Sequence, residues 1–314
     1  MIRPVQAAKA PPAQLASVAV VIPVYNSAGT LYRALQSVFA QTLLPSQVIV
    51  VDDGSQDDPR SALLEFADRI SFHVQLNSGA AAARNNAVAK ADADLIAFLD
   101  ADDYWHPRKL ELQVQAFSQD PDLLVCCTGY RCVSPMQAQA PWPLIDAVDL
   151  VRCATFAELF SHPYLATPTV MVKKAAFEAS GGFREQLRTA EDVDLWLRLG
   201  WQGAVGRLPC VLTTVVTTPH STTALHKEGV FRDNLTVIAD FVAAHPEFGA
   251  AHGGAVRYAY AKVYEDWGSG ALAVGDSATA RTKLMQSLTW RIAFRPALLL
   301  VKSLWLGAVS FLHK

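Results

Sequence analysis

The first hundred residues alternate short apolar runs with stretches of helical periodicity, and no other feature restricts the fold as strongly. The apolar runs are rich in β-branched residues, which is typical of buried strands. They span Val18–Ile22, Val48–Val51, Ile70–Leu76 and Leu95–Leu99. The stretches between them have the length of a helix and span Thr30–Gln41, Arg60–Asp68 and Ala80–Ala91. This alternation predicts an α/β domain with a mostly parallel central sheet and flanking helices.

Polar clusters directly follow three of the four predicted strands. They are PVYNS from Pro23, DDGS from Asp52 and DADD from Asp100. In open α/β sheets the ligand crevice lies outside the carboxyl ends of the strands. We therefore expect the three loops to converge on one site.

Composition limits both the partners and the compartment of the chain. The 314 residues carry 27 Lys and Arg against 29 Asp and Glu, so the net charge is −2 and no nucleic acid partner is expected. Five cysteines occur without a CxxC pair, which indicates thiols of a reducing compartment. Residues 1–17 lack the unbroken apolar core of a signal peptide, so we expect a flexible leader and a cytoplasmic protein.

Asp100, Asp102 and Asp103 place three carboxylates within four residues at the end of a predicted strand. Carboxylates this close repel one another, and a bound cation offsets the repulsion. Oxygen ligands of this kind suit Mg²⁺ or Mn²⁺, which also bind substrate phosphates. Acidic residues also stabilise the dipole of a following helix, and one is predicted from His106. The residues alone favour neither interpretation.

Three further features of the loops fit a nucleotide, and each also has a structural interpretation. Asp52 and Asp53 precede Gly54, so they fit either a tight turn or a contact with a base or a ribose. Tyr25 fits stacking on a base or ordinary packing. Arg84 lies one turn into a predicted helix, where it meets a phosphate or faces solvent. The glycine pattern of a dinucleotide fold is missing after the first strand, which argues against NAD.

Beyond Asp103 the pattern changes to longer helices and more widely separated strands. Predicted helices span His106–Gln119, Asp192–Trp201, Leu225–Ala244 and Ala255–Trp267. Predicted strands span Leu123–Thr128, Thr169–Lys173, Val205–Leu208 and Val211–Thr217. A proline-rich stretch from Ser134 to Leu144 is expected to be irregular.

Residues 280–314 form a tail that is both basic and apolar. Its basic residues are Arg281, Lys283, Arg291, Arg295, Lys302 and Lys314, and no acidic residue accompanies them. The apolar run Ala297–Leu312 is shorter than the roughly 20 residues that a spanning helix needs. It fits a helix on an anionic membrane surface, with packing on the domain and a dimer contact as alternatives. The expected location is therefore cytoplasmic, with peripheral association at the inner face of the plasma membrane.

Five segments, in this order and at these separations, resemble the glycosyltransferase family 2 pattern on the GT-A fold. They are VVIPVYN, VIVVDDGS, LNSGAAAARNNA, LIAFLDADD and TAEDVDLWLRL. The resemblance covers about Val18 to Thr223 and implies a Rossmann-like, mostly parallel central sheet. We accordingly expect a GT-A domain over residues 18–224 and a C-terminal helical extension over residues 225–314.

The resemblance implies a metal-dependent, inverting enzyme that transfers a hexose or N-acetylhexosamine from a nucleotide diphosphate sugar, with UDP as the expected nucleotide. The acceptor would be a hydroxyl of a glycan or lipid-linked molecule, in cell-surface polysaccharide biosynthesis. One alternative is a transferase similar to polyprenyl-phosphate sugar synthases, in which Arg184 and Arg188 would bind the acceptor phosphate. Another is a nucleotide-sugar-binding module that has lost catalysis.

The resemblance also assigns the donor site to residues of the strand-end loops. Pro23 and Tyr25 would flank the base. Asp53, in preference to Asp52, would accept a hydrogen bond from it. Asp100 would meet the ribose. The full donor set implied by the resemblance is Pro23, Tyr25, Asn26, Asp52, Asp53, Arg84 and Asp100.

The metal and catalytic residues are assigned in the same way. Asp102 would hold the divalent metal on the diphosphate, and Arg84 would lie near the base and phosphates. Glu191 and Asp192 match the family's Glu-Asp pair, with Asp192 in the place of the general base, whereas an acidic first helical turn is the alternative. His220 lies where some members have a histidine near the metal or diphosphate, and a lone surface histidine fits equally.

Overall fold

The computed structural model describes residues 16–137, 142, 145, 149–153, 155–163, 165–217 and 227–312, with side chains described as far as residue 304. Their strands form one nine-stranded sheet, in the order β3-β2-β1-β4-β8-β6-β9-β5, with β7 paired to β9. The strands are β1 (Val18–Val24), β2 (Gln47–Asp52), β3 (Ser71–Val74), β4 (Leu95–Phe98), β5 (Tyr104–Trp105), β6 (Leu123–Val133), β7 (Val151–Arg152), β8 (Met171–Lys173) and β9 (Ala204–Val216).

The half of the sheet that contains β1 is parallel, as the sequence predicts. Strand β1 pairs in parallel with β2 and β4, and β2 pairs in parallel with β3. The other half is mixed, because the short strand β8 runs antiparallel to both β4 and β6. In the path of the sheet, β8 alone joins the two halves.

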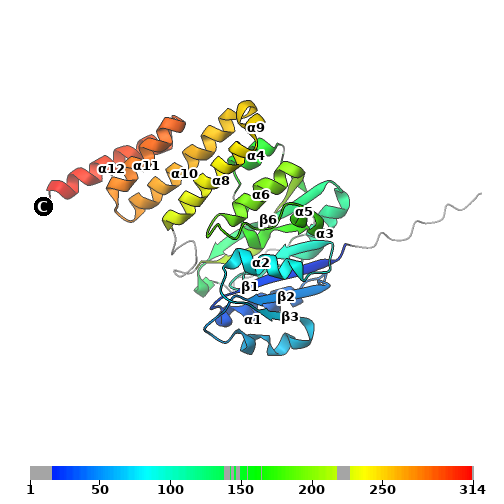
Figure 1. The fold of residues 1–314 in the computed structure, drawn as a ribbon. Helices are drawn as coiled ribbons and strands as arrows, with labels where there is room; N and C mark the ends of the chain where they lie inside the picture. Colours follow the sequence, from blue (N-terminus) through cyan, green and yellow to red (C-terminus); the bar gives the residue numbers. More distant parts are fainter. Residues whose placement is uncertain are drawn as a thin grey trace, which may run out of the picture.

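Helices cover both faces of the sheet (Figure 1). They are α1 (Ala28–Phe39), α2 (Ala80–Ala89), α3 (Lys109–Gln119), α4 (Phe156–Ser161), α5 (Lys174–Ala179), α6 (Glu191–Gln202), α8 (Lys227–Ala244), α9 (Pro246–Ala251), α10 (Gly253–Ala273), α11 (Ser277–Trp290) and α12 (Phe294–Leu312). Three segments are 3₁₀-helical, namely η1 (Pro59–Arg69), η2 (Pro135–Gln137) and η3 (Thr167–Thr169). Val20 and Ile22 of β1 pack with α1, η1 and α3, whereas Ala19 and Val21 pack with α2 and α6. The alternation along β1 therefore builds two separate core layers.

The prediction of two strands, over residues 205–208 and 211–217, is wrong. The structure has one continuous strand there, β9. Opposite β6, Leu208 pairs with Thr128 and Val211 pairs with Gly129, so two residues of β9 are extra at that point. A Cβ atom at Gly129 would lie 2.8 Å from the carbonyl oxygen of Cys210, so only glycine allows this close approach. Pro209 at this β-bulge is typical of a break between strands in sequence, although the strand continues through it.

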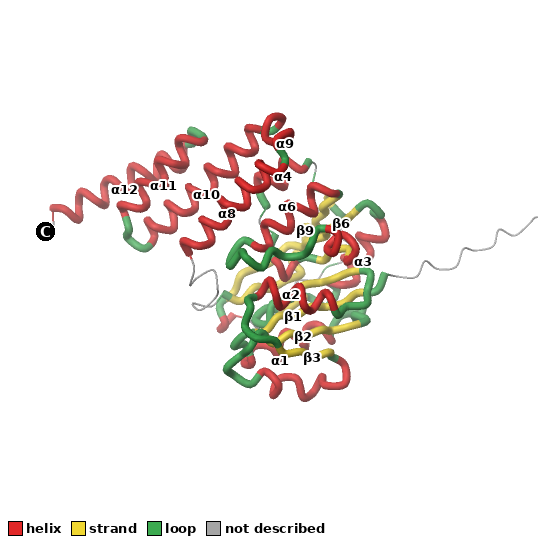
Figure 2. Tube along the Cα trace, viewed as in Figure 1, coloured by secondary structure: helices red, strands yellow, loops and turns green. Residues whose placement is uncertain are grey.

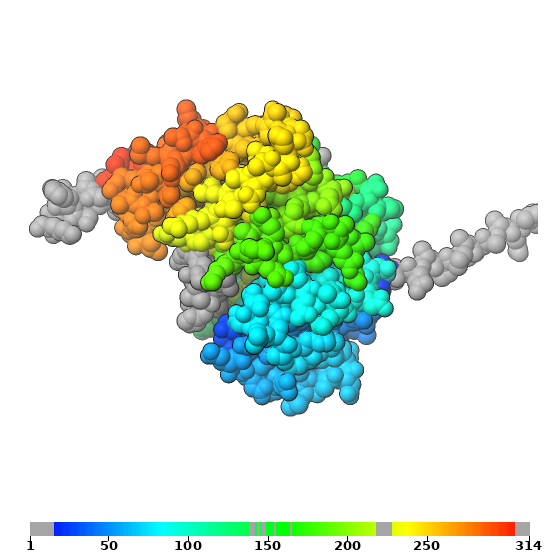
Figure 3. Space-filling model, viewed as in Figure 1, coloured from blue at the N-terminus to red at the C-terminus, as the bar shows by residue number. Residues whose placement is uncertain are grey.

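The C-terminal helices stack outward from the α/β domain (Figure 2). Helix α8 packs on α6, and α10 packs on α8 and α4. Helix α11 packs on α10, and α12 packs on α11. The space-filling view shows this layer lying against the domain at α8 and extending away from it toward the C-terminus (Figure 3). The predicted helical extension is therefore present, and α12 is its outermost helix.

Candidate active site

Arg84 links the acidic loop after β4 to the start of α6. Its Nη2 lies 2.6 Å from Oδ1 of Asp100, and its Nη1 lies 3.0 Å from Oε1 of Glu191. The arginine is buried, and both acids are only partly exposed. Burial alone opposes the charge of Arg84, but Asp100 and Glu191 outweigh it and raise the pKa of the guanidinium. Of the two sequence interpretations of Arg84, the solvent-facing one is therefore wrong.

The adjacent carboxylates of Glu191 and Asp192 begin helix α6. Burial and the charge of Asp192 raise the pKa of Glu191 to about 7, although Arg84 acts in the opposite direction. Burial also raises the pKa of Asp192. The Oδ2 atom of Asp192 accepts a hydrogen bond from Oγ1 of Thr167 at 3.3 Å. A carboxylate with a raised pKa is a stronger base near neutral pH than one on the surface.

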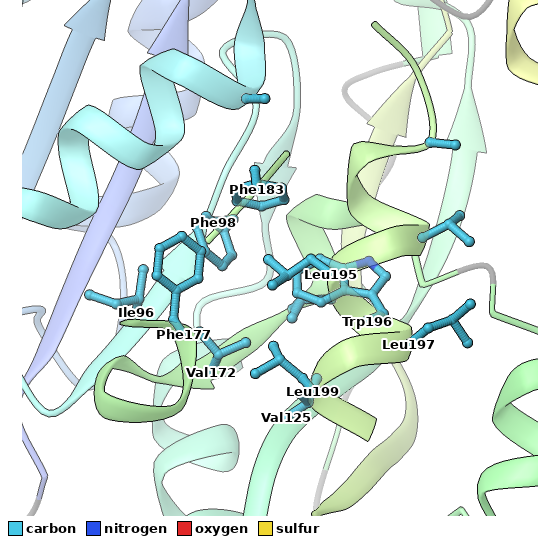
Figure 4. Packing of buried hydrophobic residues seen from close by; sticks show 14 of the residues in the cluster. Ile96, Phe98, Val125, Val172, Phe177, Phe183, Leu195, Trp196, Leu197 and Leu199 are labelled. Carbon is cyan, nitrogen blue, oxygen red and sulfur yellow. The ribbon is translucent and has the colours of Figure 1, made fainter. Parts of the chain in front are cut away.

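Aromatic packing fixes the position of α6 behind this pair (Figure 4). The ring centroid of Trp196 lies 6.2 Å from the ring centroid of Phe98 on β4 and 5.9 Å from that of Phe183. The indole Nε1 of Trp196 also donates a hydrogen bond to the carbonyl oxygen of Leu165 at 3.0 Å. Ala190, the residue before the helix, has a φ of 60°, which is unusual for a residue other than glycine. Such strain is retained where packing determines the conformation, as it does here.

Asn85 holds the loop that leads to α6, a role that was not predicted from the sequence. Its Oδ1 accepts a hydrogen bond from the amide of Phe183 at 2.9 Å, and its Nδ2 donates to the carbonyl oxygen of Phe183 at 2.9 Å. A Cβ atom at Gly182, whose φ is +70°, would lie 2.7 Å from Oδ1 of Asn85. Arg84 and Asn85 are adjacent on α2, so one helix turn positions both α6 and its preceding loop. The adjacency of the two polar residues in an Ala-rich helix is the signal that could have identified Asn85.

The carboxylate of Asp53 is already occupied by the chain itself. It accepts hydrogen bonds at 2.8 Å from Nε2 of Gln75 and from the backbone amides of Ser78 and Gly79. The side chain therefore holds the loop between β3 and α2 in place. A contact of Asp53 with a nucleobase stays a prediction.

Two other loop residues that were predicted to bind the nucleotide sugar also hold the backbone of the loops. Oδ1 of Asn26 accepts a hydrogen bond from the backbone amide of Gln56 at 2.7 Å. The backbone amide of Asn26 donates to Oγ of Ser55 at 3.0 Å. Asp52 accepts from the amide of Ser55 at 2.9 Å. The loops after β1 and β2 are thus tied together, as their predicted convergence requires. In the first of them, Tyr25 keeps 47% of its surface exposed, which leaves its ring accessible to a ligand.

The DADD loop carries more negative charge than its surroundings balance. Burial and the charge of Asp100 raise the pKa of Asp102 to about 6. Burial, Asp100 and Asp102 together raise the pKa of Asp103 to about 9, while its Oδ1 accepts from the amide of Val216 at 2.9 Å. Helix α3 begins at Lys109, well past the loop, so stabilisation of a helix dipole does not explain the cluster.

A divalent cation fits this donor set. Carboxylate oxygens are the ligands that Mg²⁺ and Mn²⁺ prefer, and a cation would offset the charge that raises these pKa values. Within the described ranges, no group of three acidic, histidine or cysteine side chains could hold a metal alone. A cation at Asp102 would therefore need further ligands, such as phosphate oxygens. His220, the second predicted ligand, lies outside the described residues.

The short helix η3, which carries Thr167, is held by side chains that follow the acidic loop. Nε1 of Trp105 donates to the carbonyl oxygen of Pro168 at 2.7 Å, and Nε2 of Gln113 donates to that of Thr169 at 3.1 Å. The fully buried Lys109 donates in turn to Oε1 of Gln113 at 2.7 Å, and burial lowers its pKa to about 7. No pattern in the sequence marks Thr167, because it lies in an irregular segment.

Arg184 is engaged in ion pairs that reach the helical layer. Its Nε lies 2.9 Å from Oδ1 of Asp194, and its Nη1 lies 2.8 Å from Oδ2 of Asp240 on α8. Arg188 is exposed. The alternative of a polyprenyl-phosphate acceptor therefore loses one of the two arginines assigned to bind the phosphate.

Comparison with known proteins agrees with this fold. Residues 19–145 match the family model described as Glycosyl transferase family 2. The putative teichuronic acid biosynthesis glycosyltransferase TuaG of Bacillus subtilis is 31% identical over 201 residues, which are 62% of this chain and 77% of that protein. The chain belongs to glycosyltransferase family 2. This confirms the resemblance inferred from the five sequence segments.

Further similarities extend this family 2 assignment. The Escherichia coli protein named UDP-Glc:alpha-D-GlcNAc-diphosphoundecaprenol beta-1,3-glucosyltransferase WfgD is 41% identical over 99 residues, 31% of this chain and 39% of that one. The structure of S. aureus TarS 1–349 in complex with UDP-GlcNAc matches with a TM-score of 0.64 and 18% identity, over 90% of this chain and 83% of that one. The match confirms the predicted GT-A fold. The chain spans between 29% and 58% of the length of five curated Rickettsia relatives.

Proposed function

We propose that the protein is an inverting glycosyltransferase that uses a nucleotide diphosphate sugar, with a UDP-sugar as its donor. One observation carries the proposal. Arg84 pairs with Asp100 and Glu191, whereas Asp192 makes no ion pair with any described residue and has a raised pKa. The site thus holds one carboxylate without an ion-pair partner, Asp192, which is ready to accept a proton, beside two carboxylates that share the charge of Arg84.

In the proposed reaction, Asp192 takes the proton of an acceptor hydroxyl as that oxygen bonds to C1 of the sugar. The bond between C1 and the diphosphate oxygen breaks at the same time, and its electron pair leaves with the nucleoside diphosphate. Attack opposite to the leaving group inverts the anomeric carbon. Proton transfer by a positioned base is typically worth roughly 10²- to 10⁴-fold in rate.

The donor site lies in the loops after β1, β2 and β4, with Tyr25 as the accessible ring for the base. Asp102 is the proposed protein ligand of Mg²⁺ or Mn²⁺, which would neutralise the leaving diphosphate without a proton transfer. UDP is favoured because WfgD is named for UDP-Glc and TarS was solved with UDP-GlcNAc. The names of WfgD and TuaG also support a lipid-linked or glycan acceptor in cell-surface polysaccharide synthesis.

The test combines a panel of UDP-sugars with the variant Asp192→Asn and the control Asp68→Asn, which removes an exposed carboxylate from η1. We expect the wild-type protein and Asp68→Asn to release UDP in the presence of Mn²⁺ and an acceptor. Asp192→Asn should bind the donor equally well in a thermal-shift assay, while its kcat falls roughly 10²- to 10⁴-fold. A kcat for Asp192→Asn near that of the wild type would overturn the assignment of the base. Retention of the anomeric configuration in the product would overturn the inverting mechanism.

A further inference from the structure

The outermost helix, α12, presents an unusually apolar surface. Its exposed residues Phe294, Leu298 and Val301 are spaced so that they lie on one side of the helix. Their exposed fractions are 82%, 56% and 63%. Ile292, just before the helix, is 92% exposed, and Leu304 is 54% exposed. We call these five residues the α12 apolar face.

The opposite side of α12 faces the rest of the protein. Pro296 and Ser303 are buried there, and Nη1 of Arg281 on α11 donates to the carbonyl oxygen of Ser303 at 3.5 Å. The helix is therefore already packed along one side, and the described part of the chain leaves the α12 apolar face uncovered. Exposed large apolar residues that cluster in this way indicate an interaction surface.

Basic side chains accompany the α12 apolar face. At 100° per residue, Lys302 and Arg295 project along one edge of it, and both are exposed. Arg295 pairs with Glu265 of α10 at 2.8 Å but remains 66% exposed. From Ser277 to the end, the sequence carries six Lys and Arg residues and no Asp or Glu. The α12 apolar face with its basic edge complements a layer that has an apolar interior and negatively charged groups at its surface.

We propose that the α12 apolar face lies in the interfacial layer of a membrane that contains anionic lipids. No helix within the described residues is long and apolar enough to cross a membrane. A helix that lies in the plane of the interface instead buries its apolar side and leaves its packed side on the protein. A second copy of the chain is a poorer partner, because in a contact between two α12 helices neither helix supplies an acidic residue to pair with Lys302 or Arg295 of the other.

The proposal is tested on the full chain by sedimentation with lipid vesicles, which requires no substrate and is therefore independent of the proposed transferase activity. Vesicles of phosphatidylcholine alone are compared with vesicles that also contain phosphatidylglycerol, at low and high salt. The double variant Leu298→Asp/Val301→Asp removes the apolar face. The matched control is Leu44→Asp/Leu64→Asp, because these leucines are 55% and 79% exposed on the α/β domain.

We expect the wild-type protein and the control to sediment with anionic vesicles at low salt, and less so at high salt because salt screens the charges. The α12 double variant should bind more than about tenfold more weakly, since each charge in the apolar layer opposes insertion. Lys302→Gln should weaken binding about fivefold, the value expected for one basic residue near an anionic surface. Equal melting temperatures would show that all variants are folded.

Three results would each overturn the proposal. The first is a wild-type protein that stays in the supernatant with anionic vesicles at low salt. The second is an α12 double variant that binds as tightly as the wild type. The third is a wild-type dimer in solution, measured by light scattering, that the same variant converts to a monomer without any vesicle binding.

Discussion

Replacement of Arg84 by methionine removes the cation that pairs with both Asp100 and Glu191. Breaking a buried ion pair by removing one partner costs about 3–5 kcal/mol. The side chains of Asp100 and Glu191 are 29% and 15% exposed, so water screens part of the loss and the lower end, about 3 kcal/mol, applies. For a chain of 314 residues, that corresponds to a melting temperature roughly 4–5 °C lower.

The loss should also depend on pH. Glu191 already has a pKa of about 7 beside Arg84, against 4.5 as its ordinary value, and without the arginine the pKa rises further. When folding raises the pKa of a carboxyl group, the protein loses stability as the pH rises from the pKa of the unfolded state to the pKa of the folded state. The variant should therefore lose more stability than the wild type between pH 5 and pH 8.

The assay is thermal unfolding of the wild type, Arg84→Met and the control Arg188→Met at pH 5.5 and pH 8. Arg188 is exposed, so its replacement should leave the melting temperature nearly unchanged. The reasoning is refuted if Arg84→Met melts within 2 °C, on the order of 1 kcal/mol, of the wild type at pH 8. It is also refuted if the difference is larger at pH 5.5 than at pH 8.

Two further predictions concern Asp192 and Asp102. Thr167→Ala should lower kcat about tenfold with little change in the donor KM, and the acid limb of the pH–rate profile should move to higher pH, because the hydroxyl of Thr167 lowers the pKa of Asp192. Thr167→Ser should restore both, and a serine variant as slow as the alanine variant would contradict this role. Asp102→Ala should abolish the part of the donor-induced thermal shift that depends on Mn²⁺, and a shift that keeps its metal dependence would exclude Asp102 as the ligand.

The parallel half of the fold could be predicted from the sequence because its signals are local. Strands β1, β2 and β4 are mostly continuous apolar runs, since both faces of a parallel sheet are buried, whereas the edge strand β3 is partly exposed. The structure places these strands within two residues of the predicted ends, and the polar loops follow them as expected. The sequence also predicts α6 with its acidic first turn, whose boundaries agree within one residue.

The partners of the site residues could not be predicted, because they are distant in sequence. Arg84 pairs with Glu191 across 107 positions, and Thr167 reaches Asp192 from an irregular segment. Asp53 has the residue type and position expected for a ligand contact, yet three donors of the neighbouring loop occupy it. Residue type and strand position therefore indicate a candidate site, whereas the division between binding and structural roles depends on tertiary contacts.

Strand β8 has a consequence for how the chain folds as it is synthesised. All strands of the parallel half have been synthesised once Phe98 has emerged. The edge of β4 that faces away from β1 has no partner until Met171–Lys173 have been synthesised. The residues of β4 are all buried in the finished fold. Through the synthesis of more than seventy residues, an apolar strand edge stays open, and such edges pair readily with other chains. Three residues at the centre of the sheet thus determine how long the nascent protein is exposed to aggregation.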